Sequence, residues 1–136
     1  MANNLQGQAL SGFVLRHVGV VGLGHMGHAF AVNLVEDAYQ VFVYDRDPKR
    51  AAALIGASAA ARLGDLSACE VVLTSLPDDD ALAEVALGSE GLTAILKPGA
   101  VHISTSTVSP GVSRRIAEEH ARWGCGGLIP DRDAVL

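Results

Sequence analysis

The sequence has 136 residues, which is enough for one domain with an ordinary hydrophobic core and little more. Apolar residues make up 49% and charged residues 18%, so the composition excludes an intrinsically disordered chain. Ten basic against fifteen acidic residues give a net charge of -5, which argues against a nucleic-acid scaffold, and two cysteines, Cys69 and Cys125, exclude a disulfide framework.

The first sixteen residues show none of the features of a targeting signal. Their single charge is Arg16 at the end of the stretch, and they lack the basic start and apolar run of a signal peptide. Apolar stretches elsewhere are far shorter than a bilayer span. We therefore interpret residues 1–16 as a mobile leader or a remnant of an expression vector. We expect a cytoplasmic protein that binds neither membranes nor nucleic acid.

The next part of the chain predicts two strands, each followed by a turn and a helix. Residues 18–21 form a valine-rich run typical of a buried strand, and residues 29–35 suit a helix packed against a sheet. Residues 40–44 predict a second strand. Asp47 is suited to an N-cap with Pro48 at the first helical position, so we expect a helix from Pro48 to about Ile55.

The remaining elements repeat this alternation. Three aspartates at positions 78–80 favour a helix start, because their charges match the positive end of the helix dipole. In chain order we expect a strand at residues 71–76, a helix over 81–87, a turn at 97–99, a strand at 100–104 and a helix from 110 to 123.

Short apolar strands that alternate with helices predict a parallel sheet covered on both faces. Because the crossovers between parallel strands are right-handed, the expected fold is α/β, a doubly wound, mostly parallel, Rossmann-like sheet. We expect this domain to span residues 17–124.

The most informative motif is Gly22-x-Gly24-x-x-Gly27, between the first predicted strand and helix. Gly22 permits a tight turn, Gly24 lets the main chain approach a pyrophosphate, and Gly27 lets the helix pack closely on the strand. The helix N-terminus adds free N–H groups and partial positive charge. The pattern alone also fits a glycine-rich turn, but its place between a strand and a helix favours a dinucleotide-binding loop.

Asp45 follows the second strand, 21 residues after Gly24, where a carboxylate is expected to accept hydrogen bonds from the adenosine ribose. A 2′-phosphate there would meet a like charge, whereas Arg46, with Lys49 and Arg50 nearby, would offset that repulsion. We therefore favour NAD as the cofactor and keep NADP as the alternative. A role for Asp45 as a turn cap alone also remains open.

Other candidate residues have simpler interpretations. His25 and His28 have a spacing that could hold a metal, but no thiol or carboxylate cluster joins them, so we expect no metal site. Cys69 and Cys125 are interpreted as small apolar fillers. The acidic run at 78–80 is interpreted as a solvated helix start.

Several motifs occur in the order known from one enzyme family. They are Gly22-Leu-Gly-His-Met-Gly27, Val43-Tyr-Asp-Arg46, Ser75-Leu-Pro77, the turn from Gly88 to Gly91, and Ser104-Thr-Ser-Thr-Val-Ser-Pro110. From residue 17 to about residue 124, the chain resembles the β-hydroxyacid dehydrogenases, which include 3-hydroxyisobutyrate, tartronate semialdehyde and 6-phosphogluconate dehydrogenases. One departure is Ser104, which stands where the family frequently has an acid.

The resemblance implies roles for individual positions. Leu23, Gly24, His25 and Met26 would contact the pyrophosphate, and Asp45 with Arg46 the adenosine ribose. Leu76 and Pro77 would line the cofactor groove. Ser106 and Thr107 would lie beside the nicotinamide and bind the substrate carboxylate, although a Ser/Thr turn that caps the helix at Pro110 fits the same residues.

The resemblance also implies a catalytic lysine in a helical domain that follows the nucleotide-binding one. The chain has two lysines, Lys49 and Lys97, and neither is placed for that role, so we assign no catalytic residue. After Gly124 the sequence no longer matches the family, and we interpret residues 125–136 as an atypical tail of a truncated or frameshifted product.

We therefore expect an NAD(P)-binding domain of a 3-hydroxyacid dehydrogenase-like oxidoreductase that is catalytically incompetent alone. The alternatives are a non-catalytic nucleotide-binding or interaction module, and a degenerate remnant that binds nothing. In the full-length parent, the partner would be a small hydroxy-acid substrate. Loss of the helical domain would expose apolar surface near the carboxyl ends of the strands and favour self-association.

Overall fold

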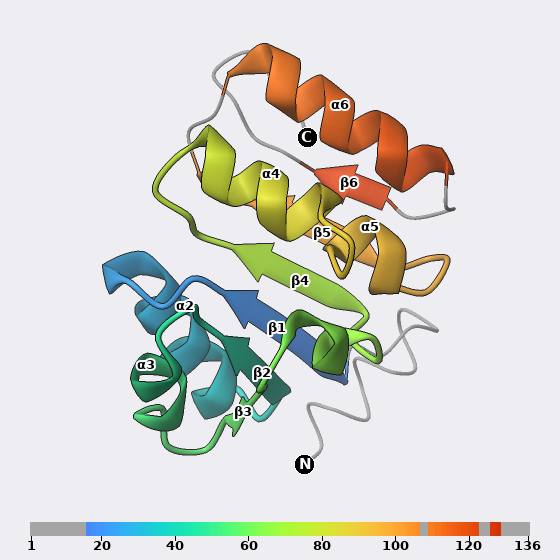
Figure 1. Cartoon of the computed structure of the whole chain (residues 1–136). Helices are drawn as coiled ribbons and strands as arrows, with labels where there is room; N and C mark the ends of the chain where they lie inside the picture. The colour runs from blue at the N-terminus through green and yellow to red at the C-terminus, as the bar shows by residue number, and fades with distance from the viewer. Residues whose placement is uncertain (1–15, 107–108, 123–125, 129–136) are drawn as a thin grey trace.

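The computed structural model describes residues 16–106, 109–122 and 126–128 (Figure 1). Outside these ranges lie residues 1–15 of the predicted leader, the predicted site residue Thr107, and the predicted domain boundary at Gly124. Cys125 and residues 129–136 of the predicted tail also lie outside them. The elements in chain order are β1 His17–Val21, α2 His25–Glu36, β2 Gln40–Tyr44, α3 Pro48–Ala52, β3 Ser58–Ala59, η1 (a 3-10 helix) Leu63–Leu66, β4 Val71–Thr74, α4 Asp79–Leu87, α5 Leu92–Ile95, β5 Val101–Ser104, α6 Pro110–Arg122 and β6 Gly126–Leu128.

The described strands form one parallel sheet in the order β3-β2-β1-β4-β5-β6. The chain runs outward from β1 through β2 to β3, then crosses back to β4 beside β1 and continues outward on the other side. The order therefore reverses between β1 and β4, at the point where doubly wound sheets bind their ligands. The predicted doubly wound parallel sheet is confirmed.

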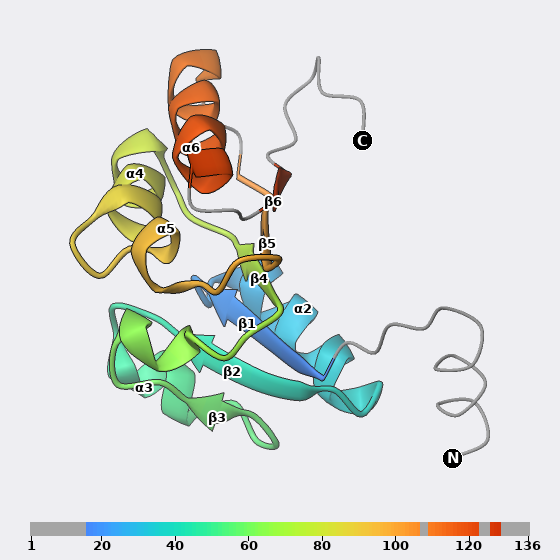
Figure 2. The same cartoon turned by 90° about the vertical axis from the view of Figure 1, so that its right-hand side faces the viewer.

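Helices cover both faces of the sheet, and adjacent residues of β1 show this directly. Val20 packs in a cluster with Ala31 of α2 and Ala51 of α3. Val21 points to the opposite face, in a cluster with Leu66 of η1 and Leu92 of α5. Helices α4, α5 and α6 lie together on that second face (Figure 2). Within the described residues, no helix is long and apolar enough to cross a membrane.

Several predicted boundaries match the structure, and some elements were not predicted. β2 has the predicted bounds, and Asp47 caps α3, accepting a hydrogen bond from the Lys49 N–H at 3.0 Å. Helix α3 ends at Ala52, three residues before the predicted end, and Gly56 at φ +89° lies in the turn that leads toward β3. β3, η1 and α5 were missed. The sheet also continues to Leu128, four residues beyond the boundary predicted at 124.

A row of buried polar side chains, which we call the histidine bridge, joins β4, β5 and α6. The Thr74 hydroxyl and the His102 Nε2 are 2.9 Å apart, and the His102 Nδ1 lies 2.9 Å from the His120 Nε2. All three side chains are fully buried, and the His120 Nδ1 has no hydrogen-bond partner among the described residues. Burial, with a smaller contribution from His120, lowers the pKa of His102 to about 3, and burial also lowers the pKa of His120. Both imidazoles are therefore neutral at pH 7.

Candidate functional site

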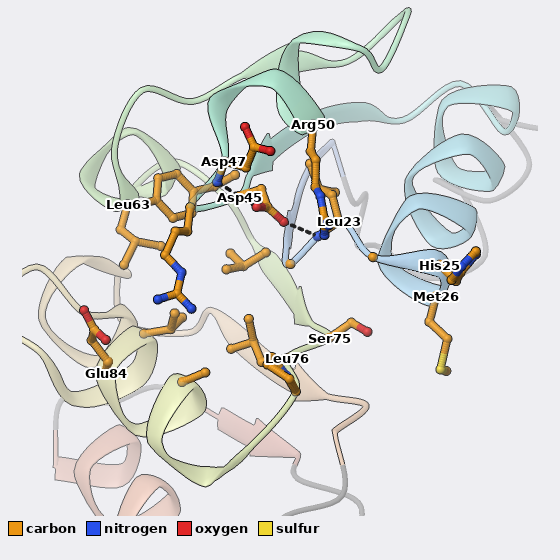
Figure 3. Close-up of a pocket in the computed structure, with 18 residues that line it drawn as sticks. Leu23, His25, Met26, Asp45, Asp47, Arg50, Leu63, Ser75, Leu76 and Glu84 are labelled. Carbon is orange, nitrogen blue, oxygen red and sulfur yellow. Dashed lines mark hydrogen bonds between the residues drawn. The ribbon is translucent and has the colours of Figure 1, made fainter.

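A cleft of about 710 Å³ opens at the carboxyl ends of β1, β2 and β4 (Figure 3). This edge of the sheet and this side of the topological reversal are where a doubly wound fold binds its ligand. The residues that line the cleft are Val21, Gly22, Leu23, Gly24, His25, Met26, Tyr44, Asp45, Arg46, Asp47, Arg50, Leu63, Ser75, Leu76, Pro77, Ala81, Glu84 and Val85.

The glycine loop fills three different steric roles. Gly22 has φ +91°, and a Cβ there would overlap the Ser75 carbonyl oxygen. A Cβ on Gly27 would overlap the carbonyl oxygen of Gly22, so this glycine sets how closely α2 approaches β1. A Cβ on Gly24 would meet nothing within 4 Å, because it would project into open space. The turn at Gly22 and the close packing at Gly27 are as the sequence predicted, and the open space at Gly24 leaves room for the predicted approach of a pyrophosphate.

The N-terminus of α2 is open toward the cleft. Its N-cap residue is Gly24, and no side chain caps the first N–H groups. Uncapped N–H groups and the positive end of the helix dipole together favour an anion such as a pyrophosphate. His25 and Met26 are exposed in the first turn of α2 and line the mouth of the cleft.

Asp45 joins the glycine loop to the loop after β2. One carboxylate oxygen accepts the Leu23 N–H at 2.7 Å, and the other accepts the Asp47 N–H at 2.8 Å (Figure 3). Each oxygen has a second lone pair, so the carboxylate can still accept from a ligand hydroxyl. Asp45 thus fixes the shape of the cleft as well as lining it, a structural role that the sequence did not reveal.

Two arginines line the cleft beside Asp45. Arg46 and Arg50 both have exposed side chains. Lys49, which the sequence placed in the same group, does not line the cleft. The cation cluster proposed for a 2′-phosphate therefore consists of the two arginines.

The loops after β4 and β5 are tied together. The Ser106 hydroxyl accepts the Leu76 N–H at 2.7 Å, and the Ser106 N–H donates to the Ser104 hydroxyl at 3.2 Å. Leu76 and Pro77 line the cleft as expected, whereas Ser106 is buried and does not. The structure therefore places Ser106 behind the loop that follows β4. Thr107, its predicted neighbour in the substrate site, lies outside the described residues.

The acidic run at the start of α4 is more than a solvated helix start. Asp78 is the N-cap and accepts the Ala81 N–H at 2.8 Å. Asp79 accepts the Ser109 N–H at 3.0 Å, which joins α4 to the start of α6. These aspartates thus hold the position of α4, one wall of the cleft.

The remaining candidates show no arrangement for metal or thiol chemistry. Among the described residues, no group of three or more His, Cys, Asp or Glu side chains is placed to hold a metal. Burial raises the pKa of the Cys69 thiol to about 12, so this cysteine is unreactive and serves as a core filler. Lys97 precedes β5, at the opposite edge of the sheet from the cleft, and neither it nor Lys49 lines the cleft.

One wall of the cleft was missed by the sequence analysis. Leu63 comes from η1, an element that was not predicted, and Ala81, Glu84 and Val85 come from one face of α4. The spacing of these α4 residues, three and four apart, places them on the same side of a helix. That spacing was readable, but nothing in the sequence showed which side of α4 faces the cleft.

Known proteins resemble this chain in sequence and in fold. A family profile described as the NAD binding domain of 6-phosphogluconate dehydrogenase matches residues 17–128. An uncharacterised oxidoreductase of Bacillus subtilis is 39% identical over 111 residues, which cover 79% of this chain and 38% of that protein. The 3-hydroxyisobutyrate dehydrogenase of Pseudomonas aeruginosa is 33% identical over 110 residues, covering 79% of this chain and 37% of that enzyme.

Solved structures of other proteins superpose on this chain. An imine reductase of Streptomyces aurantiacus superposes with a TM-score of 0.72 at 35% identity, over 84% of this chain and 40% of that chain. A protein described as Psf3 in complex with NADP+ superposes with a TM-score of 0.76 at 28% identity, over 81% of this chain and 40% of that chain. The chain thus spans about two-fifths of the length of these relatives. With the profile matched across the sheet and the glycine loop in place, the chain belongs to the family of the NAD-binding domain of 6-phosphogluconate dehydrogenase.

Proposed function

We propose that the cleft binds NAD, as the cofactor domain of a 3-hydroxyacid dehydrogenase-like oxidoreductase. The observation that carries this proposal is the open space over Gly24, beside the uncapped N-terminus of α2. The two neighbouring glycines have no room for a side chain, while the middle one borders empty space, which is the shape a pyrophosphate requires. Leu23, His25 and Met26 complete this part of the cleft.

The two halves of the dinucleotide then lie on opposite sides of the glycine loop. The adenosine ribose lies against Asp45, whose oxygens each have a free lone pair. The nicotinamide lies toward Met26 and Ser75, near the loops that follow β4 and β5. When bound, the nicotinamide supplies the hydride acceptor or donor. The residues of this chain hold the cofactor and shape its groove.

The favoured cofactor is NAD rather than NADP. A 2′-phosphate beside Asp45 would cost about 4 kcal/mol per charge pair at about 4 Å and an effective dielectric constant of about 20. Arg46 and Arg50 reduce that cost, but both are exposed, where attraction between charges is screened by water and salt. Paired calorimetric titrations with NAD and NADP test this preference, and tighter binding of NADP contradicts it.

The longer relatives include a 3-hydroxyisobutyrate dehydrogenase of Pseudomonas aeruginosa. For a longer protein that contains this domain we propose NAD-dependent oxidation of a 3-hydroxy acid, or the reverse reduction, with Ser106 and Thr107 near the substrate carboxylate. Neither lysine of the described chain lines the cleft, so this chain alone is expected to show no turnover. A steady-state assay against a panel of hydroxy acids tests this, and turnover by the pure chain contradicts it.

The absence of a lysine among the residues that line the cleft supports a second candidate function, a nucleotide-binding module without catalysis. A cleft that holds a dinucleotide but has no lysine along its walls fits a sensor as well as an enzyme fragment. The two candidates differ when a catalytic domain from a relative is supplied in trans. Restored turnover favours the oxidoreductase, whereas binding without turnover favours the module.

We also propose that the chain associates with a second copy of itself. Val101 and Ile103 of β5 point away from α6 and are only half-buried, and Met26 is 55% exposed at the cleft mouth. Apolar surface of this kind favours self-association. Light scattering across a concentration series tests the proposal, and a constant monomer mass contradicts it.

A further inference from the structure

The cleft has two chemically different ends (Figure 3). His25 and Met26 lie at one end, Leu63 and Glu84 lie at the other, and Asp45 lies between them. If the pyrophosphate lies over the glycine loop and a ribose against Asp45, the base attached to that ribose extends toward Leu63 and Glu84. This step rests on the proposed function.

The Leu63 and Glu84 end has the form of a slot for a flat ring. Tyr44, Leu63 and Val85 give it apolar walls from β2, η1 and α4, and all three are half-buried. Such walls hold a heterocycle by apolar contact, but they do not distinguish one purine from another. Discrimination between bases requires a polar group that reaches the ring edge.

Glu84 is the carboxylate at this end that is free to interact with a ligand. Three carboxylates line the cleft, those of Asp45, Asp47 and Glu84. Asp45 accepts the backbone N–H groups of Leu23 and Asp47, and the Asp47 carboxylate accepts the backbone N–H of Lys49. The Glu84 side chain is exposed and has neither a hydrogen bond nor an ion pair with any residue that the structure describes. Its oxygens are acceptors only, because an ionised carboxylate carries no proton to donate.

We propose that Glu84 makes the cleft selective for a 6-aminopurine over a 6-oxopurine. The amino group at the 6-position of adenine donates a hydrogen bond to the carboxylate. A 6-oxo group presents lone pairs at the same place, which the negative carboxylate repels. Glu84 is thus a specificity-determining residue for the base, on the wall opposite the loop that holds the ribose.

The test compares NAD with nicotinamide hypoxanthine dinucleotide, whose base carries a 6-oxo group and an N1–H where adenine carries the 6-amino group and an N1 lone pair. We expect the unaltered chain to bind NAD about tenfold more tightly, the lower range for a hydrogen bond to a charged group, since Glu84 is exposed. In Glu84→Gln the ratio should fall to about twofold, because the amide can turn to accept from one base or donate to the other.

The matched control is Glu118→Gln, which removes the same charge from an exposed glutamate on α6, outside the cleft. Its ratio should equal that of the unaltered chain. Equal affinity for the two dinucleotides, or an unchanged ratio in Glu84→Gln, would overturn the role of Glu84 and leave the proposed function standing. Failure of both dinucleotides to bind the unaltered chain would overturn the proposed function, and the role of Glu84 with it.

Discussion

The glycine loop and the histidine bridge each fasten a helix to the same sheet, but by opposite means. At the loop, α2 approaches β1 so closely that Gly27 and Gly22 have no room for a side chain. At the bridge, α6 is joined to the sheet by a hydrogen bond between the buried imidazoles of His120 and His102. The His102 imidazole is in turn hydrogen-bonded to the Thr74 hydroxyl. The contact at the glycine loop requires the absence of a side chain at Gly22 and Gly27. The contact at the histidine bridge requires that buried polar atoms be hydrogen-bonded.

This difference determines which kind of substitution or change of pH destabilises each region. Added volume disturbs the glycine loop, because close-packed backbone has no way to move aside. Loss of a partner or gain of a proton disturbs the bridge, because a buried polar or charged group without a partner is costly. The proposed cofactor site lies at the glycine loop, so added volume there should affect ligand affinity, whereas changes at the histidine bridge should affect mainly stability.

The largest expected effect is that of Gly27→Ala. The new Cβ would overlap the Gly22 carbonyl oxygen, so α2 must shift away from β1. We expect a loss of about 3 kcal/mol in the free energy of unfolding, measured by urea denaturation, together with loss of NAD binding.

The matched variant is Gly24→Ala, whose Cβ meets no atom within 4 Å. Its stability should change by less than about 0.5 kcal/mol, while NAD affinity falls because the methyl group occupies the space for the pyrophosphate. Equal stability losses in the two variants would contradict the steric difference between these glycines.

The second effect is that of His102→Leu, which removes the middle member of the bridge. The Thr74 hydroxyl and the His120 Nε2 then lose their partners inside the protein, so we expect a loss of about 2 to 3 kcal/mol by urea denaturation. His28→Leu, at an exposed position on α2, is the control and should change stability by less than about 0.5 kcal/mol. Similar losses in both variants would contradict a special role for the bridge.

The third effect is the dependence of stability on pH. Burial lowers the pKa of His102 from its ordinary value of 6.5 to about 3 and also lowers that of His120, so between these pH values the unfolded chain binds more protons than the folded chain. The contribution of these neutral imidazoles to the free energy of unfolding is therefore complete above about pH 6.5. It is lost as the pH falls below that value, by about 1 kcal/mol per pH unit. Urea midpoints measured from pH 7 to pH 4 report it. The slope should be shallower in His102→Leu, and an unchanged slope would contradict the assignment.

The fourth effect is that of Asp45→Asn, whose expected cost in stability is smaller than that of Gly27→Ala or His102→Leu. An amide can accept only through its oxygen, so one of the N–H groups of Leu23 and Asp47 loses its acceptor, at a cost of about 1 kcal/mol. NAD affinity should fall about tenfold because a charged hydrogen bond to the ribose is replaced by a neutral one. Unchanged affinity, measured by calorimetry, would indicate that Asp45 only shapes the loop.

The sequence predicted the parts of the site that depend on local geometry. The glycine spacing, the Asp47 cap and the strand that ends before Asp45 all involve neighbours within a few residues, where turn and cap chemistry is specific. The alternation of strands and helices was sufficient for the doubly wound sheet, because handedness and parallel pairing leave few other topologies.

Contacts across the sheet could not be predicted in this way. His102 and His120 are 18 residues apart, and nothing local shows that α6 turns His120 toward β5. Nothing local shows that the Ser106 hydroxyl accepts the N–H of Leu76, 30 residues earlier in the chain. The two-residue strand β3 is too short to carry an alternation pattern. These features depend on packing that only the assembled fold determines.

Calorimetric titration of the chain with NAD and with NADP is the most direct measurement of what the cleft does. The predicted result is saturable binding of one NAD per chain, with weaker binding of NADP, and loss of the NAD signal in Gly24→Ala while the fold is retained. Absence of binding to either dinucleotide at about 1 mM by the folded chain would contradict a cofactor site in the cleft.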